Sequence, residues 1–246
     1  SMFLPDRFVI GTCPKCGYAS AYADQCEKCS SVIGPGELLD ARCQTCHNPP
    51  QLKSSPHLFL DLEKLSEKID QWVESKKDVW NNHVYSIAKK WIHEGLRTRS
   101  ITRDLTWGVS VPTKEFEKKV FYVWFDAPIG YITFTKELGE SYYEKYWKSG
   151  TSKIYHFLGK DNIPFHTMIW PAMLMGYDSL NLPYDVPANE FLTLQGGKFS
   201  TSRNWAVWLP DYLATYEPDP LRYLLSANMP ETADAAGGQG INGTGR

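Results

Sequence analysis

The sequence predicts an α/β protein that carries a small Cys-rich module, and two observations support this fold class. In residues 118–232, short strands rich in aromatic and β-branched residues alternate with helical segments, which is typical of a parallel sheet. In residues 3–56, cysteine, glycine and proline are frequent and neither helical nor strand periodicity is sustained. A chain of 246 residues with 42% hydrophobic residues can bury a core in one large domain or two smaller ones.

Composition narrows the possible environments and partners. The formal net charge of −2 predicts no large basic surface, so any contact with nucleic acid would have to be local. No apolar run approaches the ~18 residues that a membrane span needs, and no signal peptide is visible. These features indicate a cytoplasmic protein that does not associate with membranes.

The first element is a metal-binding module. All six cysteines fall in three Cys-x-x-Cys pairs within the first 46 residues. Such a turn directs two sulfurs at one ion, and two turns complete a tetrahedral zinc site without an open position for water, so the zinc is expected to be structural. The preferred set of ligands is Cys13, Cys16, Cys26 and Cys29. Cys43 and Cys46 either complete a second site with His47 or His57 or replace one of the first two pairs.

Residues 61–95 are expected to form two amphipathic helices. The apolar residues of the first helix recur on one face, and those of the second helix do the same. The two stripes consist of Leu62, Leu65, Ile69, Trp72 and Val73, and of Val84, Ile87, Ala88, Trp91 and Ile92. Burial of these stripes accounts for both helices without a cofactor.

The rest of the chain is expected to form a sheet of three strands, with helices between them. The strands are "KVFYVWF" (119–125) before a helix that starts at Pro128, "KIYHFLG" (153–159) before a helix over 165–176, and "NEFLTL" (189–194). Asp219 and Pro220 are expected to start a further helix. Ligands of parallel sheets bind beyond the carboxyl ends of the strands, where the loops 126–128, 159–162 and 196–203 lie.

The loop "GGKFSTSR" (196–203) is poorly suited to a core. It contains two glycines, three hydroxyl side chains and two cationic residues, and only one bulky apolar residue. A surface turn would explain it, but a mobile loop that binds phosphate explains its composition better. The tail "AAGGQGINGTGR" (235–246) has almost no apolar content and is predicted to be disordered.

Several motifs in a fixed order together resemble methionyl-tRNA synthetase, a class I aminoacyl-tRNA synthetase, from about Phe3 to Thr232. They are "LPDRFVIGTCPKCGY", "DQCEKC", "SITRDLTWGVSVP", "FYVWFDAPIGY", "HFLGKDNIPFH", "GGKFSTS" and the start of "PETADAA". The resemblance implies a connective module with zinc knuckles over 2–112, with the knuckles in 3–56. It also implies the second half of a Rossmann-like catalytic domain over 113–232 and a disordered tail over 233–246.

The resemblance implies activation of methionine by ATP with magnesium, followed by transfer to tRNA(Met). The implied methionine pocket consists of Trp124, Ala127, Pro128, Tyr131 and His166, with Trp170 one helical turn further on. Aromatic rings suit a thioether, because sulfur packs favourably against them. The implied nucleotide contacts are Gly159 and Asp161 at the ribose and Asn189 and Leu192 at the adenine. The implied catalytic loop residues are Lys198, Ser200, Thr201 and Ser202.

Two departures from the family pattern limit the expected activity. Thr201 stands where the family signature has its second lysine, which leaves Lys198 and Arg203 to meet the phosphate charge. The His-x-Gly-His motif and the anticodon-binding helices are not in the sequence, so the chain is expected to be a fragment with little or no activity alone. Robust ATP–pyrophosphate exchange with methionine would contradict this expectation.

Two other functions remain open from the sequence. A class I synthetase for another apolar amino acid would share the Lys-x-Ser-x-Ser loop and differ in the pocket "VWFDAPIGY". A zinc-ribbon protein that binds nucleic acid would share the cysteine pairs. The near balance of acidic and basic residues in the Cys-rich module argues against this second alternative.

Overall fold

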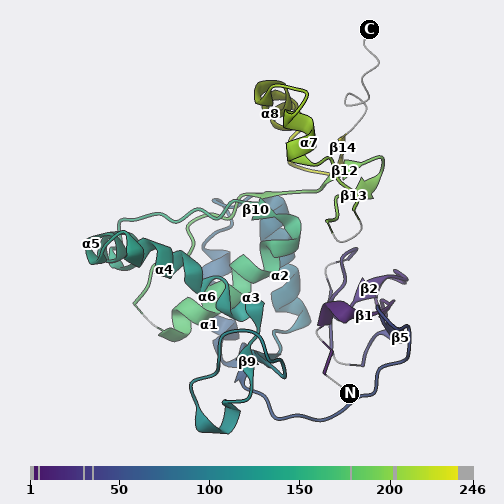
Figure 1. Ribbon diagram of the computed structural model, residues 1–246. Helices are drawn as coiled ribbons and strands as arrows, with labels where there is room; N and C mark the ends of the chain where they lie inside the picture. Colours follow the sequence, from purple (N-terminus) through teal and green to yellow (C-terminus); the bar gives the residue numbers. More distant parts are fainter. Residues whose placement is uncertain are drawn as a thin grey trace. The chain divides into compact units, whose positions relative to one another are not determined.

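The computed structural model describes residues 3–4, 6–29, 31–34, 36–177, 179–201 and 204–237. The chain divides into two compact units, and Figure 1 shows its course. Unit 1 comprises residues 1–67 and 95–150, and unit 2 comprises residues 68–94 and 151–246. Within the described residues, every helix is too short or too polar to cross a membrane. The division at residue 112 that the resemblance implies stays a prediction.

The Cys-rich part of unit 1 consists of short antiparallel strands. The strands are β1 (Val9–Thr12), β2 (Ala21–Tyr22), β3 (Asp24–Gln25), β4 (Val32–Ile33) and β5 (Leu39–Cys43). β1 lies between β2 and β5 in one sheet, and β3 pairs with β4 in a hairpin. A Cβ atom on Gly11 would lie 2.6 Å from the carbonyl oxygen of Leu39, so glycine allows β1 and β5 to approach each other.

The rest of unit 1 consists of two antiparallel strand pairs and a run of helices. The pairs are β6 (Phe59–Leu60) with β7 (Arg99–Ser100) and β8 (Thr102–Arg103) with β9 (Val120–Phe121). After β9 follow α3 (Val123–Asp126), α4 (Ile129–Glu137), α5 (Glu140–Tyr143) and a π-helical turn (Glu144–Lys148). Short 3-10 turns cover Asp6–Phe8, Glu63–Leu65 and Lys114–Phe116.

The predicted strand 119–125 is wrong in its second half and in its direction. β9 ends at Phe121 and pairs with β8 in the antiparallel sense, and residues 123–126 form α3. The guanidinium of Arg103 lies 3.9 Å from the ring centroid of Tyr122, and the Tyr122 amide donates to the Ile101 carbonyl. Tyr122 is therefore held in an extended conformation as the N-cap of α3, and the chain turns into a helix after it. The helix predicted to start at Pro128 is confirmed, because Pro128 is the N-cap of α4.

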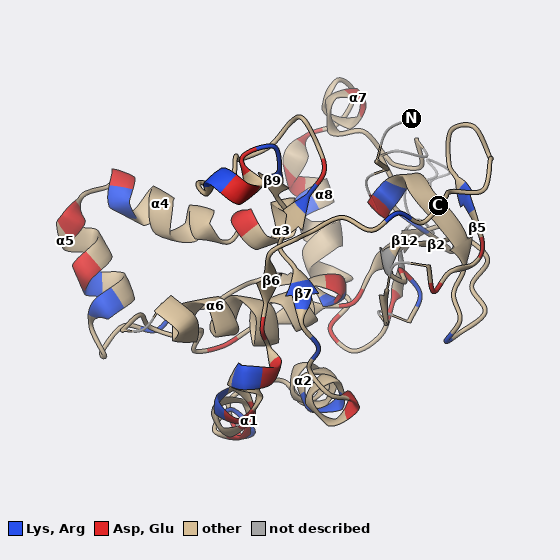
Figure 2. Ribbon diagram, turned by 90° about the horizontal axis from the view of Figure 1, so that it is seen from below, with Lys and Arg blue, Asp and Glu red and all other residues tan. Residues whose placement is uncertain are grey.

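Both predicted amphipathic helices are present. α1 (Ser66–Glu74) begins at the end of unit 1 and continues into unit 2, which also contains α2 (Asn82–Glu94). Ile69 and Val73 of α1 and Val84 of α2 are fully buried. Both helices contain acidic and basic residues, as the red and blue segments of α1 and α2 in Figure 2 show.

The predicted parallel pairing is confirmed in unit 2. β10 (Leu158–Gly159) and β11 (Ala188–Asn189) pair in the parallel sense, and a parallel bridge joins Tyr155 to Asp185 ahead of them. A 3-10 turn (Lys160–Asn162), a π-helical turn (Phe165–Ile169) and α6 (Trp170–Tyr177) connect the two strands. α6 contains no charged residue, and it is tan throughout in Figure 2.

The last part of unit 2 differs from the sequence prediction at three points. It contains β12 (Leu192–Leu194), β13 (Gly197–Lys198), α7 (Leu209–Leu213), α8 (Pro218–Ala227) and β14 (Ala235–Gly237). The predicted strand 189–194 is interrupted, because β11 ends at Asn189 and β12 starts at Leu192. α8 starts at Pro218, one residue before the predicted start at Asp219 and Pro220. Residues 235–237 were assigned to the disordered tail, but they pair in parallel with β12. Residues 238–246 of that tail lie outside the described part of the chain.

Candidate functional site

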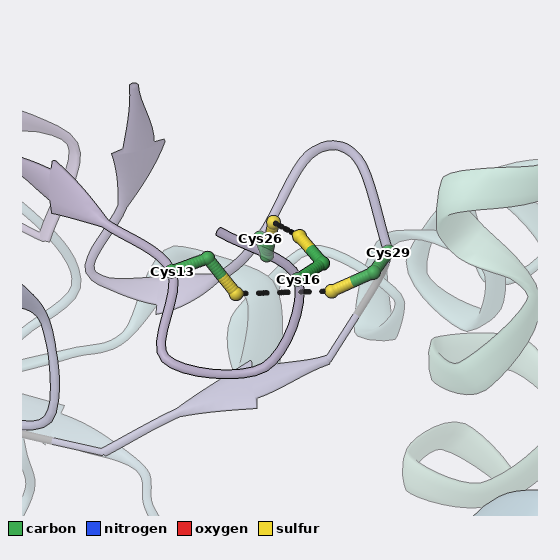
Figure 3. Close-up of side chains that lie close together, drawn as sticks. All are labelled: Cys13, Cys16, Cys26 and Cys29. Carbon is green, nitrogen blue, oxygen red and sulfur yellow. Dashed lines mark hydrogen bonds between the residues drawn. The ribbon is translucent and has the colours of Figure 1, made fainter. Parts of the chain in front are cut away.

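Four cysteines of the Cys-rich part bring their sulfurs together (Figure 3). Sγ of Cys13 lies 3.8 Å from Sγ of Cys29, and the sulfurs of Cys16 and Cys26 are 3.7 Å apart. All four sulfurs lie within 4.8 Å of one another. Zinc binds thiolates at ~2.3 Å in a tetrahedron, which requires sulfurs ~3.8 Å apart. The four side chains therefore fit one tetrahedral zinc ion.

Local backbone geometry explains why the sulfurs converge. The amide of Cys13 donates to the Tyr18 carbonyl, and the amide of Gly17 donates to the Cys13 carbonyl. Gly17 adopts a φ of 70°, which a glycine reaches without strain. The amide of Cys26 likewise donates to the Ser31 carbonyl. Each pair therefore sits in a tight turn that presents two sulfurs on the same side.

The thiols of this cluster differ in their tendency to ionise. Burial raises the pKa of Cys26 to about 12. Burial also opposes the ionisation of Cys29, but hydrogen bonds from the side chain and backbone of Ser31 and from Cys16 and Cys26 outweigh it and lower the pKa to about 6. Without a cation, thiolates this close repel one another, so a bound divalent ion would let more of the thiols ionise.

The third Cys-x-x-Cys pair has the same turn geometry but lies outside the cluster. The amide of Cys43 donates to the Asn48 carbonyl, and the amide of His47 donates to the Cys43 carbonyl. Hydrogen bonds from the amides of Cys46 and Thr45 lower the pKa of the Cys43 thiol. Within the described residues, the only group of three or more potential ligands close enough to share an ion is the four-cysteine cluster.

His57, which the sequence offered as a ligand for a second site, has both ring nitrogens engaged elsewhere. Its Nδ1 lies 2.9 Å from Oγ1 of Thr102, and its Nε2 lies 3.3 Å from a carboxylate oxygen of Asp104. Asp104 also pairs with Lys119, whose ammonium donates to Ser55 Oγ at 2.7 Å. Burial and the positive charge of Lys119 lower the pKa of His57. This network was not foreseen, because its members are scattered over residues 55–119.

The unit 1 residues of the predicted methionine pocket lie on α3 and the start of α4. Trp124 is on α3, Ala127 and Pro128 connect the two helices, and Tyr131 is in the first turn of α4. This spacing of three to four residues places them on one side of the helical run. Trp124 is 49% exposed and Tyr131 is 41% exposed, so both rings are accessible within unit 1. Partial burial raises the pKa of the Tyr131 phenol.

Arg103 holds the start of this helical run, a role that its sequence context does not indicate. Its Nε and Nη2 donate to one carboxylate oxygen of Asp6 at 3.1 and 3.0 Å. Its Nη1 donates to the carbonyls of Ser100 and Thr102. Together with its contact to the Tyr122 ring, this network fixes the N-cap of α3. The sequence signal, one arginine in "SITRDLTWG", was too weak to single it out.

The unit 2 residues of the predicted pocket, His166 and Trp170, are both buried. His166 lies in the π-helical turn, and turns of this type often occur at functional sites. Its Nδ1 is 3.1 Å from the Asn162 carbonyl, and its ring centroid is 5.0 Å from that of His156. Burial lowers the pKa of His166, and burial together with the His166 charge lowers the pKa of His156 to about 4. Both rings are therefore neutral near pH 7.

The predicted nucleotide contacts meet at the ends of the parallel strands of unit 2. Gly159 of β10 is the register partner of Asn189 of β11, although 30 residues separate them in sequence. The next turn carries Asp161, whose carboxylate lies 3.4 Å from the ammonium of Lys198. This ammonium also lies 3.8 Å from the ring centroid of Phe191. Phe191 directly precedes Leu192, the first residue of β12. The fold thus places Gly159 and Asn189 at the carboxyl ends of β10 and β11, pairs Asp161 with Lys198, and puts Leu192 at the start of β12.

The loop that follows β12 begins with a short antiparallel hairpin. Gln195 and Gly196 form the turn between β12 and β13 with φ values of 51° and 79°. A Cβ atom on Gly197 would lie 3.0 Å from Nε1 of Trp205, so this glycine permits the indole to pack on the hairpin. The amides and carbonyls of Ser200 and Trp205 pair across the loop. Thr201 follows Ser200, whereas Ser202 and Arg203 lie outside the described residues.

The sequence and the fold are both similar to those of known proteins. The sequence matches the family described as tRNA synthetases class I (M) over residues 1–237. It is 52% identical over 237 residues to a methionine–tRNA ligase of Dehalococcoides mccartyi and 47% identical over 251 residues to that of Pyrococcus furiosus. These matches cover 94% and 95% of the chain. A structure of Mycobacterium tuberculosis methionyl-tRNA synthetase bound by methionyl-adenylate is similar, with a TM-score of 0.64 and 26% identity over 80% of the chain.

The chain therefore belongs to the class I tRNA synthetases of the methionine group, and the resemblance drawn from its motifs is confirmed. The predicted α/β fold class is confirmed as well. The match spans only 42% of the Dehalococcoides ligase, 34% of the Pyrococcus ligase and 38% of the Mycobacterium chain.

Proposed function

We propose that this chain supplies the zinc-binding connective module and the second half of the catalytic domain of a methionine–tRNA ligase. Such an enzyme joins methionine to ATP to give methionyl-adenylate and pyrophosphate, and it then passes the aminoacyl group to tRNA(Met). The similarity to named methionine–tRNA ligases over 94% and 95% of the chain supports the reaction. In this proposal residues 2–112 belong to the connective module and residues 113–232 to the catalytic domain.

For the methionine side chain, the proposed contacts are Trp124, Ala127, Pro128 and Tyr131 in unit 1, and His166 and Trp170 in unit 2. Two properties support these contacts. Aromatic rings attract a thioether, and a neutral His166 avoids the cost of a buried charge beside an apolar substrate.

The nucleotide is proposed to bind at the strand ends of unit 2. The Asp161 carboxylate accepts hydrogen bonds from ribose hydroxyls beside Gly159, and Asn189 and Leu192 contact the adenine. Lys198 meets the triphosphate, where negative charge builds up in the transition state, and the hydroxyls of Ser200, Thr201 and Ser202 donate hydrogen bonds. One observation carries this proposal: Gly159 pairs with Asn189 while Asp161 and Lys198 lie 3.4 Å apart in the same unit.

In this proposal the ion pair between Asp161 and Lys198 opens when a nucleotide binds. Both side chains are about half exposed, so the ion pair is weak and opens at little cost. A ribose that bonds to Asp161 would compete with the lysine, and the released ammonium could then reach the phosphates.

The metal of the four-cysteine cluster is proposed to be zinc with a structural role. Cys13, Cys16, Cys26 and Cys29 would hold it, and it would supply folding energy to a part of the chain with a small apolar core. Cys43 and Cys46 are proposed to bind metal as well, since their turn has the geometry of the first. A metal-to-protein ratio near two would support both sites, and a ratio near one would leave only the four-cysteine site.

Titration calorimetry with MgATP tests the nucleotide site directly. The variants D161N and K198M are expected to bind at least about tenfold more weakly than the wild type, because each removes a charge that meets the ligand. D78N serves as a matched control, because Asp78 is an exposed aspartate of the same unit. Equal affinities for all four proteins would contradict the proposed nucleotide contacts.

A thermal-shift panel of amino acids addresses the identity of the substrate. Methionine is expected to raise the melting temperature in the presence of an adenosine ligand, while leucine and isoleucine have smaller effects. A larger shift with another apolar amino acid would favour a class I synthetase of different specificity.

A further inference from the structure

The ion pairs of Lys160 connect three separate chain segments at the strand ends of unit 2. Its ammonium donates to a carboxylate oxygen of Glu190 and to one of Asp234, each at 2.6 Å. Lys160 directly follows β10, Glu190 directly follows β11, and Asp234 directly precedes β14. These three residues are called the Lys160 knot below.

The knot is further anchored on its carboxylate side. The oxygen of Asp234 that accepts from Lys160 also accepts from the Phe191 amide at 2.8 Å. The Glu190 side chain is only 7% exposed, and its other oxygen lies 2.7 Å from Nε2 of His83 on α2. The Lys160 ammonium lies 4.5 Å from the ring centroid of Phe191. Charge-assisted hydrogen bonds of this length are stronger than neutral ones, and partial burial limits competition from water.

Every proposed contact to the adenosine is adjacent to this knot or one residue further away. Gly159 and Asp161 flank Lys160, and Asn189 precedes Glu190. Leu192 follows Phe191 and pairs with Ala235, the residue after Asp234. A shift of any knot member would therefore move a nucleotide contact with it.

We propose that Lys160 is a positioning residue of the nucleotide subsite. It holds the carboxyl ends of β10 and β11 and the amino end of β14 in place without touching the nucleotide. This inference rests on the proposed function for the location of the nucleotide. Two carboxylates already neutralise the ammonium, and its side chain is 23% exposed, so it is poorly placed to serve a phosphate group. The ammonium of Lys198 lies further from its carboxylate partner, Asp161, and its side chain is 40% exposed, which suits a ligand-binding lysine.

Hydrogen exchange of the complete chain without nucleotide tests the positioning role. The informative variant is K160M/E190Q/D234N, because removal of the lysine alone would leave a buried carboxylate without its counter-charge. Amides in residues 158–162 and 189–194 are expected to exchange about tenfold faster than in the wild type, whereas those of α6 keep their rates. K160R keeps the charge and both acceptors, so it should stay within about threefold of the wild type.

Unit 2 offers a matched control for the triple change. Lys89 on α2 contacts Asp70 at 2.5 Å and Glu74 at 3.3 Å on α1, which is also one lysine between two carboxylates. The variant K89M/D70N/E74Q should leave the exchange of residues 158–162 and 189–194 unchanged. If K160M/E190Q/D234N leaves these segments unchanged as well, the positioning role is refuted.

The same hydrogen-exchange experiment with MgATP distinguishes failure of this inference from failure of the proposed function. If MgATP slows exchange in the wild-type segments and the triple variant loosens them, both stand. If the triple variant loosens them but MgATP leaves no footprint on the wild type, the knot still positions the strand ends and the nucleotide assignment falls. If K160M weakens MgATP binding without any change in exchange, Lys160 is itself a ligand contact and the positioning role is overturned.

Discussion

The Cys-rich part of unit 1 and the helical part of unit 2 are held together by different means. In the first, the buried cluster among the described residues is small and two of its members are cysteines: Cys13, Ala21, Cys26, Ile33 and Leu38. In the second, aliphatic and thioether side chains from α1, α2, the π-helical turn and α6 are almost fully buried: Ile69, Val73, Val84, Ala88, Met168 and Leu174.

This difference indicates which part of the chain depends on a metal for its stability and which part is stabilised by apolar burial. A region with so few apolar side chains gains little from burial and depends on its metal. The strand ends that carry the proposed nucleotide contacts belong to unit 2, which buries more apolar side chains than the Cys-rich part of unit 1 does. Loss of the metal should therefore disorder the knuckles and leave the nucleotide strands folded.

Removal of the metal has the largest expected effect. The variant C26S, or chelation of the wild type, is expected to unfold the Cys-rich part, because a structural zinc contributes on the order of 10 kcal/mol. The amide hydrogen-exchange rates of β1, β2 and β5 should rise to those of an unfolded chain, while the amides of α2 and α6 stay protected. S20A is the control, since Ser20 is an exposed residue of the same part and is not among the proposed metal ligands. Simultaneous loss of protection in α2 would show that the two regions are not independent.

A cavity introduced into unit 2 should destabilise unit 2 and leave the Cys-rich part folded. Ile69 is fully buried on α1, so I69A is expected to destabilise unit 2 by about 2–5 kcal/mol through lost burial and the cavity left behind. Urea unfolding followed by hydrogen exchange gives the size and place of the change. L213A, at a side chain that is 50% exposed, should cost less than about 1 kcal/mol. Release of bound metal by I69A would argue against separate sources of stability.

Mild acid should weaken unit 2 through its buried histidine. The pKa of His156 falls from 6.5 to about 4 in the folded chain, because burial and the His166 charge oppose protonation. Below pH 6.5 the unfolded chain therefore binds more protons, and stability falls until the pH reaches about 4. Between pH 7 and pH 5 the expected loss is about 2 kcal/mol. H156F should flatten this dependence in urea titrations of α2 and α6. A wild-type curve that is already flat would contradict the buried, neutral state of His156.

The smallest effect is expected at the surface of unit 2. Lys89 bridges Asp70 and Glu74 with side chains that are 34–54% exposed. K89M should cost no more than about 1 kcal/mol, because exposed ion pairs contribute little and salt screens them. Comparison of urea midpoints at low and high salt measures this contribution. A larger loss would place part of the stability of unit 2 outside its apolar core.

Elements with a strong local signal could be predicted from the sequence. The Cys-x-x-Cys pairs predicted the thiol cluster because the turn geometry is local, as the bond from Gly17 to Cys13 shows. The apolar stripes predicted α1 and α2 because Ile69, Val73 and Val84 have no alternative to burial. The motif order predicted that Gly159 and Asn189 would meet, although they are distant in sequence.

Features that depend on distant contacts could not be predicted. The run "KVFYVWF" has strand propensity throughout, yet the chain turns into a helix after Tyr122, where Arg103 is held by Asp6 from 97 residues away. The ion pairs of Lys160 with Glu190 and Asp234 span 30 and 74 residues, and nothing local to these residues signals them.

A hydrogen-exchange footprint of a methionyl-adenylate analogue on the wild-type chain would test the assignment most directly. The assignment predicts that adenosine alone slows exchange in residues 158–162 and 188–198. It also predicts that the methionyl analogue adds protection at residues 124–131 and 165–170, where the proposed pocket residues lie. No footprint at the strand ends, or an equal footprint from a leucyl analogue, would contradict it.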